Sequence, residues 1–265
     1  MTTLEKGTAL VTGASSGIGA IYADRLAHDG YDLILVARRR EPLDALARRL
    51  TDETGRSVQV FQADLNDPRG VAGVEQLLRT DRTLSMLVNN AGLGATAPLL
   101  EADVERMAEI ISLNVSALTR LTYAAVPGFV ARGGGTVINI ASVVAIAPEL
   151  LNGVYGGSKA YVLAFTRSLH HELAGKGVRV QAVLPGATAT EFWDVAGRPI
   201  EHLPSAIVMP ADAMVDAALA GLRQGELFTI PALPDAGDLA AYEEARAKLL
   251  PQLSRSAPAE RYLVA

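Results

Sequence analysis

The chain has 265 residues, of which 49% are hydrophobic, and it carries a formal net charge of −5 and no cysteine. This composition is sufficient for a full core, the acidic balance argues against nucleic acid as the main partner, and the absence of thiols excludes disulfides and cysteine nucleophiles. The first residues lack the apolar stretch of a signal peptide, and no apolar run approaches the roughly 20 residues that span a bilayer. We therefore expect a single cytoplasmic domain over residues 1–265, with no membrane partner.

A first strand is predicted at Thr8–Val11, followed by a glycine-rich turn at residues 12–19 and an amphipathic helix at Ala20–His28. Glycine lets the backbone turn sharply and approach a pyrophosphate, whose charge is met by the N–H groups at the start of a helix. The alternative is a tight turn without a ligand. The flanking strand and helix favour the phosphate-binding interpretation.

The second predicted strand, Asp32–Ala37, runs directly into Arg38, Arg39 and Arg40. An acid near the end of this strand would hold a ribose 2′-hydroxyl, whereas guanidinium groups suit a 2′-phosphate. The alternative is a solvated start to the next helix, at Pro42–Leu50, but a cation gains nothing from the positive end of a helix dipole. The sequence thus favours a 2′-phosphate, with Arg38 as the first contact, Arg39 as the second, and Arg40 in solvent.

Two further strands are predicted before a pair of helices. Ser57–Gln62 is followed by Asp64-Leu65 and a helix cap near Asp67-Pro68, and Leu84–Val88 is followed by Asn-Asn-Ala-Gly at residues 89–92. The helices span Glu101–Leu113 and Val115–Ala131, either as two elements or as one bent at Asn114. Asparagine is a poor residue for a helix interior because its amide competes for backbone groups.

The residues from Thr136 to Lys159 carry the strongest signs of chemistry. A strand rich in β-branched residues, Thr136–Ala141, ends at Ser142, and a helix opens at Tyr155. Tyr155 and Lys159 are four residues apart and share one helix face. A nearby ammonium lowers a tyrosine pKa from about 10, which allows proton exchange at neutral pH. Surface packing is the commoner reason for such a pair, so the other motifs must decide.

The last third of the chain begins with a strand at Val178–Leu184. A partly apolar, irregular segment follows, and it predicts a mobile substrate lid at about residues 187–209. A helix at Pro210–Gln224, a strand at Leu227–Ile230, a helix at Asp235–Leu250 and a loosely specified tail at 251–265 complete the chain. The four histidines have no metal-ligand spacing, so we expect no metal site.

These motifs, namely the glycine turn, Asn89-Asn-Ala-Gly92, Asn114, Ser142, Tyr155-Gly-Gly-Ser-Lys159 and Pro185-Gly186, resemble in order and spacing those of the short-chain dehydrogenase/reductase family. The resemblance covers about residues 8–190. It implies hydride transfer between a nicotinamide cofactor and a carbonyl or secondary alcohol. The alternation of strands and helices independently predicts a doubly wound, mostly parallel, Rossmann-like α/β sheet with helices on both faces.

The resemblance also assigns roles to four catalytic residues. Ser142 would hold the carbonyl oxygen and Tyr155 would deliver the proton. Lys159 would bind the nicotinamide ribose and lower the Tyr155 pKa, and Asn114 would hold a water that links the lysine to solvent. Substrate contacts are expected from Ser142, Tyr155, Phe192 and Trp193.

The expected cofactor is NADP(H) rather than NAD(H), because arginines replace the acid after the second strand. Its expected contacts are Gly13, Ser15, Ser16, Gly17, Ile18, Gly19, Arg38, Arg39, Asp64, Leu65, Asn90, Ala91, Gly92, Tyr155, Lys159, Pro185, Gly186, Thr188 and Thr190. The expected partner is a small, apolar carbonyl or alcohol. A homodimer or homotetramer is expected through the outer positions of Val115–Ala131 and Val162–Leu173.

Two positions depart from the family pattern. Gly156 and Gly157 follow the tyrosine where an alanine often stands, and glycine costs roughly 1 kcal/mol in a helix interior, so we expect a looser first turn. Thr188 replaces a frequent valine or isoleucine, in what resembles a backbone contact.

Two other functions stay open for this fold. One is a cofactor-binding regulator without turnover, against which the complete Asn–Ser–Tyr–Lys set argues. The other is an epimerase or dehydratase that acts through a transient ketone.

Overall fold

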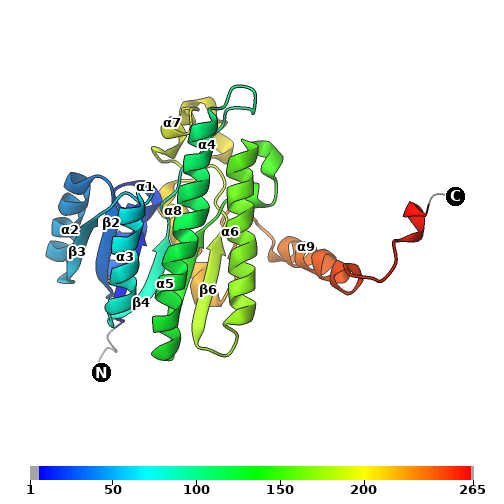
Figure 1. Cartoon of the computed structure of the whole chain (residues 1–265). Coiled ribbons are helices and arrows are strands. Elements are labelled where there is room, and N and C mark those ends of the chain that lie inside the picture. Colours follow the sequence, from blue (N-terminus) through cyan, green and yellow to red (C-terminus); the bar gives the residue numbers. More distant parts are fainter. Residues whose placement is uncertain (1–5, 264–265) are drawn as a thin grey trace. The chain divides into compact units, whose positions relative to one another are not determined.

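The computed structural model describes residues 6–263 of the chain. The chain divides after Pro231 into two compact units (Figure 1). The first contains the sheet and the helices that cover it, and the second contains one helix and the residues that follow it.

Within residues 6–263, seven parallel strands form one sheet in the order β3-β2-β1-β4-β5-β6-β7. They are β1 (Thr8–Thr12), β2 (Asp32–Ala37), β3 (Val58–Gln62), β4 (Leu84–Asn89), β5 (Gly135–Ile140), β6 (Val178–Val183) and β7 (Phe228–Thr229). The strand order reverses between β1 and β4, and ligands of such sheets bind in the crevice beyond the carboxyl ends of the strands at this point. The predicted parallel sheet is confirmed.

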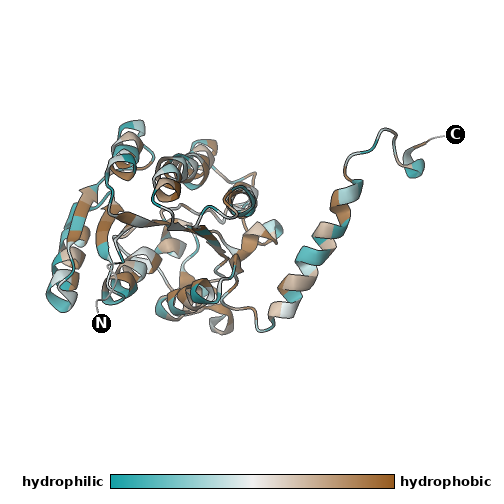
Figure 2. Cartoon of the chain, turned by 90° about the horizontal axis from the view of Figure 1, so that it is seen from below, coloured by the Kyte–Doolittle hydropathy of each residue, from teal (hydrophilic) through white to brown (hydrophobic). Residues whose placement is uncertain are grey.

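Helices cover both faces of the sheet (Figures 1 and 2). Apolar residues of α1 (Gly17–His28), α2 (Arg40–Thr54) and α8 (Ala211–Gln224) pack against one face, and those of α3 (Pro68–Thr80), α5 (Leu118–Ala131) and α6 (Gly153–Glu172) pack against the other. In Figure 2 the strands form a brown layer between these two sets of helices. The central strands are buried on both sides, which explains why they are continuous aliphatic runs instead of alternating ones.

Three helices begin earlier in the structure than the sequence predicts. α1 begins at Gly17, directly within the glycine turn, and α2 begins at Arg40. α6 begins at Gly153 because the Asn152 side chain accepts hydrogen bonds from the N–H groups of Val154 and Tyr155. This cap fixes the first turn of α6, which carries Tyr155.

The pair of helices predicted around Asn114 is one continuous helical run. α4 (Val104–Ile111), a π-helical turn (Ser112–Ala117) and α5 follow one another without a break (Figure 1). A π-helical turn inside an α-helix is rare and frequently marks a functional site. Here the turn contains Asn114, which is where the sequence predicted a bend.

The second unit contains α9 (Ala236–Leu249), which Asp235 caps through the N–H of Gly237. No residue of α9 is buried. The large apolar side chains exposed in this unit are those of Tyr242, Leu249, Leu250, Leu253, Tyr262 and Leu263. Among the described residues, no helix is both long enough and apolar enough to cross a bilayer.

Candidate active site

The glycine-rich turn connects β1 to α1 at the point where the strand order reverses. Gly13 and Gly17 have φ values of +66° and +53°, in the left-handed region that favours glycine. A Cβ on Gly19 would collide with the Gly13 carbonyl oxygen. Ser16 is the N-cap of α1, yet its hydroxyl makes no capping bond, and the first turn of α1 contains no acid. This cradle fits a phosphate group, which would bind the N–H groups at the start of α1.

The Asn-Asn-Ala-Gly sequence, which begins at the last residue of β4, ties β4 to β1. The Thr12 hydroxyl accepts hydrogen bonds from the N–H groups of Asn90 and Ala91, both 3.0 Å long, and donates to the Val88 carbonyl. The Asn90 amide donates to the Thr12 carbonyl at 2.9 Å. The Asn90 side chain therefore holds the crevice in shape, and Thr12 is a site-building residue that sequence reasoning missed.

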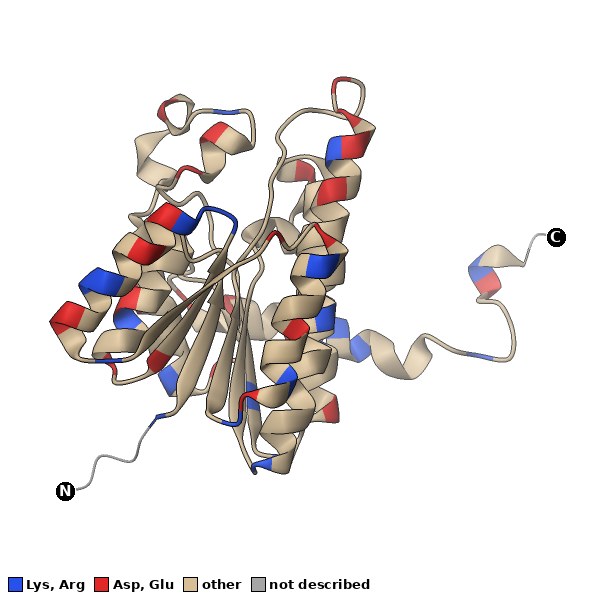
Figure 3. Cartoon of the chain, turned by 60° about the vertical axis from the view of Figure 1, so that its left-hand side comes forward, with Lys and Arg blue, Asp and Glu red and all other residues tan. Residues whose placement is uncertain are grey.

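The three arginines after β2 have different environments. Arg40 pairs with Asp44 one helical turn later. Arg39 donates to the Ser16 hydroxyl at 3.2 Å and to Glu191 at 3.3 Å. Arg38 is exposed, and its side chain forms no ion pair with any residue that the structure describes. Figure 3 shows this cationic turn in blue, between β2 and α2.

The structure also places the residues expected to contact the rest of a dinucleotide. Asp64 and Leu65 follow β3; Asp64 is exposed, with one carboxylate oxygen accepting the N–H of Asn66, and Leu65 is buried. Pro185 follows β6, and its carbonyl accepts the N–H of Val143. A Cβ added to Gly17 would lie 3.2 Å from the methyl carbon of Thr190, so the segment after β6 lies against the glycine turn.

Ser142 and Tyr155 meet at the carboxyl end of β5. The Ser142 hydroxyl donates to the Pro185 carbonyl at 3.3 Å and accepts the Val144 N–H at 3.4 Å. Burial raises the pKa of Tyr155 to about 12, and a hydrogen bond with Ser142 opposes that increase only in part. At neutral pH the phenol keeps its proton, which is the form that a proton donor needs.

Lys159 lies one helical turn after Tyr155, but it does not act on the tyrosine pKa as predicted. Its ammonium donates to the Ile140 carbonyl at 2.8 Å and lies 5.9 Å from the centroid of the Tyr155 ring. Burial lowers the Lys159 pKa to about 8. The prediction that Lys159 lowers the pKa of Tyr155 is therefore wrong for this structure. Both side chains are buried, and the ammonium binds a backbone carbonyl instead of the phenol oxygen.

Asn114 is 1% exposed and uses its amide to hold the loop after β4. Its oxygen accepts the Leu93 N–H at 2.9 Å, and its nitrogen donates to the Leu93 carbonyl at 2.9 Å and to the Ser158 hydroxyl at 3.0 Å. Ser158 in turn donates to the Tyr155 carbonyl. A Cβ on Gly92 would lie 3.3 Å from the Asn114 oxygen and 3.6 Å from the Lys159 nitrogen, so these two groups flank Gly92.

The structure thus brings the four predicted catalytic residues together at the carboxyl ends of β4 and β5. Sequence reasoning missed Ser158 and the capping role of Asn152. Both had a visible signal, because Ser158 stands inside the Tyr-Gly-Gly-Ser-Lys motif and Asn152 precedes a helix.

The packing around Gly156 explains why a glycine stands there, in the stretch where an alanine is frequent in the family. A Cβ at Gly156 would lie 2.8 Å from the Cβ of Pro148, in the short turn Pro148–Leu150, whereas a Cβ at Gly157 would meet nothing within 4 Å. The loop that follows Ser142 therefore packs directly on the first turn of α6. Glycine at 156 permits this close approach.

The predicted lid contains the short helix α7 (Phe192–Val195). The Phe192 ring lies 5.7 Å from the Tyr155 ring, centroid to centroid. Trp193 is buried, touches Phe192 edge to face and donates its indole N–H to the Thr188 carbonyl at 3.0 Å. Phe192 thus contacts the tyrosine that was predicted to be catalytic, and Trp193 packs against Phe192. The expected substrate contact by Trp193 stays a prediction.

Among residues 6–263, one cluster of potential metal ligands lies away from this site, although the sequence predicted none. Ligand atoms of Asp24, His28 and Glu53 lie within 4.8 Å of one another. The Arg49 guanidinium already pairs with both carboxylates, at 2.9 and 2.8 Å. The Arg49 guanidinium therefore already neutralises the Asp24 and Glu53 carboxylates.

The chain is similar to known proteins in sequence and in fold. Residues 7–199 match the family described as short chain dehydrogenase. A short-chain dehydrogenase from Sphingobium yanoikuyae, solved in complex with NADPH, is 47% identical, with a TM-score of 0.94 over 97% of this chain and 99% of that one.

Two further relatives differ in how much of their length is matched. The bulky-bulky ketone specific alcohol dehydrogenase from Comamonas testosteroni is 41% identical, with a TM-score of 0.90 over 98% of this chain and 100% of that one. The very-long-chain 3-oxoacyl-CoA reductase from Anas platyrhynchos is 34% identical over 193 residues, which are 69% of this chain and only 60% of that protein.

Proposed function

Because this chain belongs to the short-chain dehydrogenase family, we propose that it is an NADP(H)-dependent oxidoreductase acting on a ketone or the matching secondary alcohol, with Tyr155 as the general acid and base. The observation that carries this proposal is the buried Tyr155 phenol, which interacts with Ser142 and lies one helical turn from the Lys159 ammonium. A placed proton donor beside a second hydroxyl is what the reduction of a carbonyl requires.

The fit of the cofactor rests on the glycine cradle and the cationic turn. NADPH supplies the hydride when bound. The N–H groups at the start of α1 would hold its pyrophosphate, and Arg38, with Arg39 beside Ser16, would hold its 2′-phosphate. The other expected contacts lie at the ends of the neighbouring strands, at Asp64, Leu65, Ala91, Gly92, Pro185, Gly186 and Thr188.

In the reducing direction, Ser142 donates a hydrogen bond to the substrate oxygen and Tyr155 transfers its proton to that oxygen. The raised pKa keeps the Tyr155 proton in place until negative charge develops on the oxygen. Lys159 would hold the ribose of the cofactor through its ammonium, which the Ile140 carbonyl keeps in place. Asn114 contributes its second oxygen lone pair to a water that reconnects Lys159 to solvent. In the oxidising direction these proton movements reverse.

The substrate class we propose is a ketone with at least one bulky apolar group. The Phe192 ring faces Tyr155, and Val195 of α7 and Leu150 of the loop after Ser142 expose apolar side chains. The name of the Comamonas testosteroni relative, specific for ketones with two bulky groups, supports the same choice.

The test is the loss of NADPH absorbance with a panel of ketones of increasing size. Tyr155→Phe should lower turnover by at least about 10²-fold, typical of general acid catalysis, and leave the Kd for NADPH nearly unchanged. Tyr161→Phe is the matched control, because this tyrosine of the same helix bonds to Thr119 and lies outside the site. Near-normal turnover in Tyr155→Phe would contradict the assignment. Substrate conversion without net NADPH consumption would indicate an epimerase or dehydratase instead.

We also propose that the chain forms a homodimer or homotetramer through the outer faces of α5 and α6. Tyr123, Phe165 and Tyr161 form a row of stacked rings there, with centroid distances of 6.3 and 5.6 Å. Tyr123 is 65% exposed, so this aromatic row reaches the surface, and exposed apolar patches mark surfaces at which proteins interact.

A further inference from the structure

The catalytic tyrosine is covered by a ring that rests on a glycine. Phe192 contacts Tyr155, and the tip of its ring occupies the space where a side chain at residue 94 would lie. A Cβ built on Gly94 would collide with Cζ of Phe192, lie 2.6 Å from its Cε2 and 3.1 Å from its Cε1. Under this ring Tyr155 is only 5% exposed.

The backbone on both sides of Gly94 is held by contacts that oppose a shift. On its N-terminal side, both polar groups of the Leu93 backbone bond to the buried Asn114 amide. On its C-terminal side, Ala95 is buried in an apolar cluster with Met107 and Ile110 of α4. Gly94 is itself buried, and its φ lies outside the left-handed region, so an alanine backbone would be tolerated there. The collision would therefore have to be relieved by movement of Phe192.

Phe192 is also linked to this loop through the remainder of α7. The Ala196 carbonyl accepts hydrogen bonds from both the N–H and the hydroxyl of Thr96, at 3.1 and 2.9 Å. The Ala196 N–H in turn donates to the Phe192 carbonyl at 2.9 Å. The loop at residues 93–97 and helix α7 thus form one wall beside Tyr155. Within this wall, the Phe192 ring of α7 lies against the Gly94 backbone of the loop.

We propose that Gly94 is a specificity-determining residue. Its missing side chain lets the Phe192 ring lie against Tyr155, where it forms the surface on which the apolar group of a ketone packs. The role in substrate preference rests on the proposed function. The fit of Phe192 against Gly94 does not depend on it. A side chain at 94 displaces the ring, widens the space over Tyr155 and shifts the preference toward bulkier ketones.

Trp193 reports on this fit without any need for activity. It is the single tryptophan of the chain and is 7% exposed. Its ring packs edge to face on the Phe192 ring, with 5.7 Å between the ring centroids. Gly94→Ala should shift Trp193 emission to the red and increase its quenching by acrylamide, as should Phe192→Ala. Gly153→Ala is the matched control, because a Cβ there would meet nothing within 4 Å.

The decisive comparison is the double variant. If Gly94→Ala acts by displacing Phe192, then Gly94→Ala/Phe192→Ala should behave as Phe192→Ala alone, in fluorescence, in thermal stability and in substrate preference. The ratio of kcat/KM for a bulky ketone to that for a small one should rise roughly 10-fold or more in each of these variants. A Gly94→Ala variant that loses stability should regain it in the double variant, since the added methyl then has room.

Two results would separate this inference from the proposed function. A wild type that reduces no ketone, but whose Trp193 emission responds to Gly94→Ala and not to Gly153→Ala, would overturn the proposed function and the specificity role while supporting the fit of Phe192 on Gly94. A ketone-reducing wild type whose emission and substrate ratio ignore Gly94→Ala, or in which the two substitutions add independently, would overturn the role of Gly94.

Discussion

The buried ammonium of Lys159 makes the stability of this protein depend on pH in a definite direction. Burial lowers the Lys159 pKa from 10.5 to about 8, so the folded chain releases a proton that the unfolded chain still binds. Between these two pKa values the unfolded state binds more protons, and the free energy of unfolding of the wild type therefore rises with pH. Lys159→Met removes this contribution, because methionine fills similar space and does not titrate.

The size of the effect follows from the shift in pKa. At 1.36 kcal/mol per unit, a change from 10.5 to about 8 corresponds to about 3 kcal/mol of destabilisation at neutral pH. Since Lys159 is only 6% exposed, solvent screening reduces this figure little. Between about pH 7 and about pH 10, the free energy of unfolding of the wild type should therefore increase by roughly 2–3 kcal/mol relative to that of Lys159→Met.

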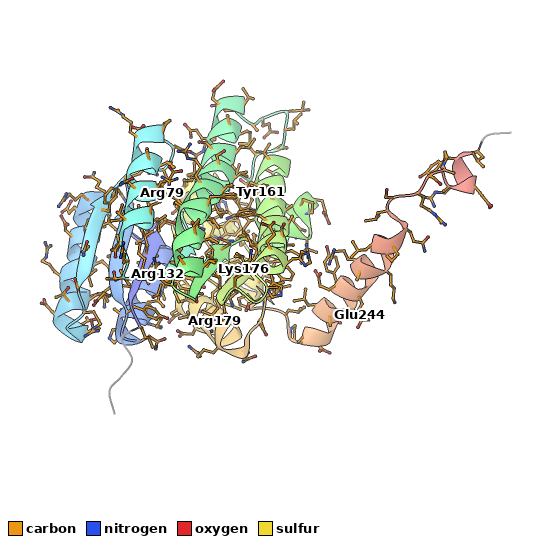
Figure 4. The ribbon with its side chains drawn as sticks, turned by 60° about the horizontal axis from the view of Figure 1, so that its bottom comes forward. Arg79, Arg132, Tyr161, Lys176, Arg179 and Glu244 are labelled. Atoms are coloured by element: carbon orange, nitrogen blue, oxygen red, sulfur yellow. The ribbon has the colours of Figure 1, made fainter. Side chains whose placement is uncertain are left out.

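The assay is urea unfolding of both proteins at these two pH values. Costs of the substitution that do not depend on pH, such as the lost hydrogen bond to Ile140, cancel when the difference at one pH is subtracted from that at the other. Lys176→Met is the control, because this lysine, labelled in Figure 4, is exposed and its removal empties no buried site. An equal difference between wild type and Lys159→Met at both pH values would refute the reasoning.

Three other predictions concern the cofactor, the catalytic helix and assembly. Arg38→Asp should weaken NADPH by roughly 10–100-fold or more and NADH far less, measured as Kd, and an equal loss for both would remove Arg38 from the 2′-phosphate site. Gly156→Ala should lower the free energy of unfolding, measured in urea, by about 1–3 kcal/mol, because the added methyl group would collide with the Pro148 turn. Gly157→Ala should raise it by up to about 1 kcal/mol. Equal effects of the two substitutions would show that the contact with Pro148 is unimportant. Sedimentation at micromolar concentration should show a dimer or tetramer that Tyr123→Arg weakens, and a single 27.8 kDa species in the wild type would contradict the proposed assembly.

The parts of the fold that were predictable are those in which local pattern and burial agree. The strands β1 and β2 are aliphatic runs bounded by turn residues, and such a run has few alternatives to a buried strand. Gly13, Asn90 and Pro185 follow β1, β4 and β6 in the sequence, so the carboxyl edge of the sheet could be located as well, although β2 runs directly into arginines. The four residues proposed as catalytic could be selected because each stands at or just after such an edge, or on the helix that follows it.

What the sequence could not supply are effects that depend on distant neighbours. The direction of the Tyr155 pKa shift depends on the burial of its phenol, which spacing along a helix does not reveal. The same spacing does not show that the Lys159 ammonium binds Ile140, on a neighbouring strand. Gly94 carries no local signal either, since its φ is ordinary and its value becomes visible only when Phe192, from a segment far along the chain, lies against it. The start of α6 was misplaced for a simpler reason, because the side-chain cap of Asn152 lengthens the helix without changing its hydrophobic pattern. The N-cap residues of α1 and α2 make no such bond.

The hydrogen bonds around the site indicate how its geometry survives the loss of a reacting group. Ser142 is held by the Pro185 carbonyl, Lys159 by the Ile140 carbonyl and Asn114 by the Leu93 backbone, so each is anchored to main chain at or beyond the end of a strand. Tyr155 is positioned by the capped start of α6. Of the other three side chains, that of Ser142 forms a hydrogen bond with Tyr155. Removing one side chain therefore leaves the anchors of the others intact. This is the physical reason to expect that Tyr155→Phe abolishes proton transfer while the cofactor site keeps its shape.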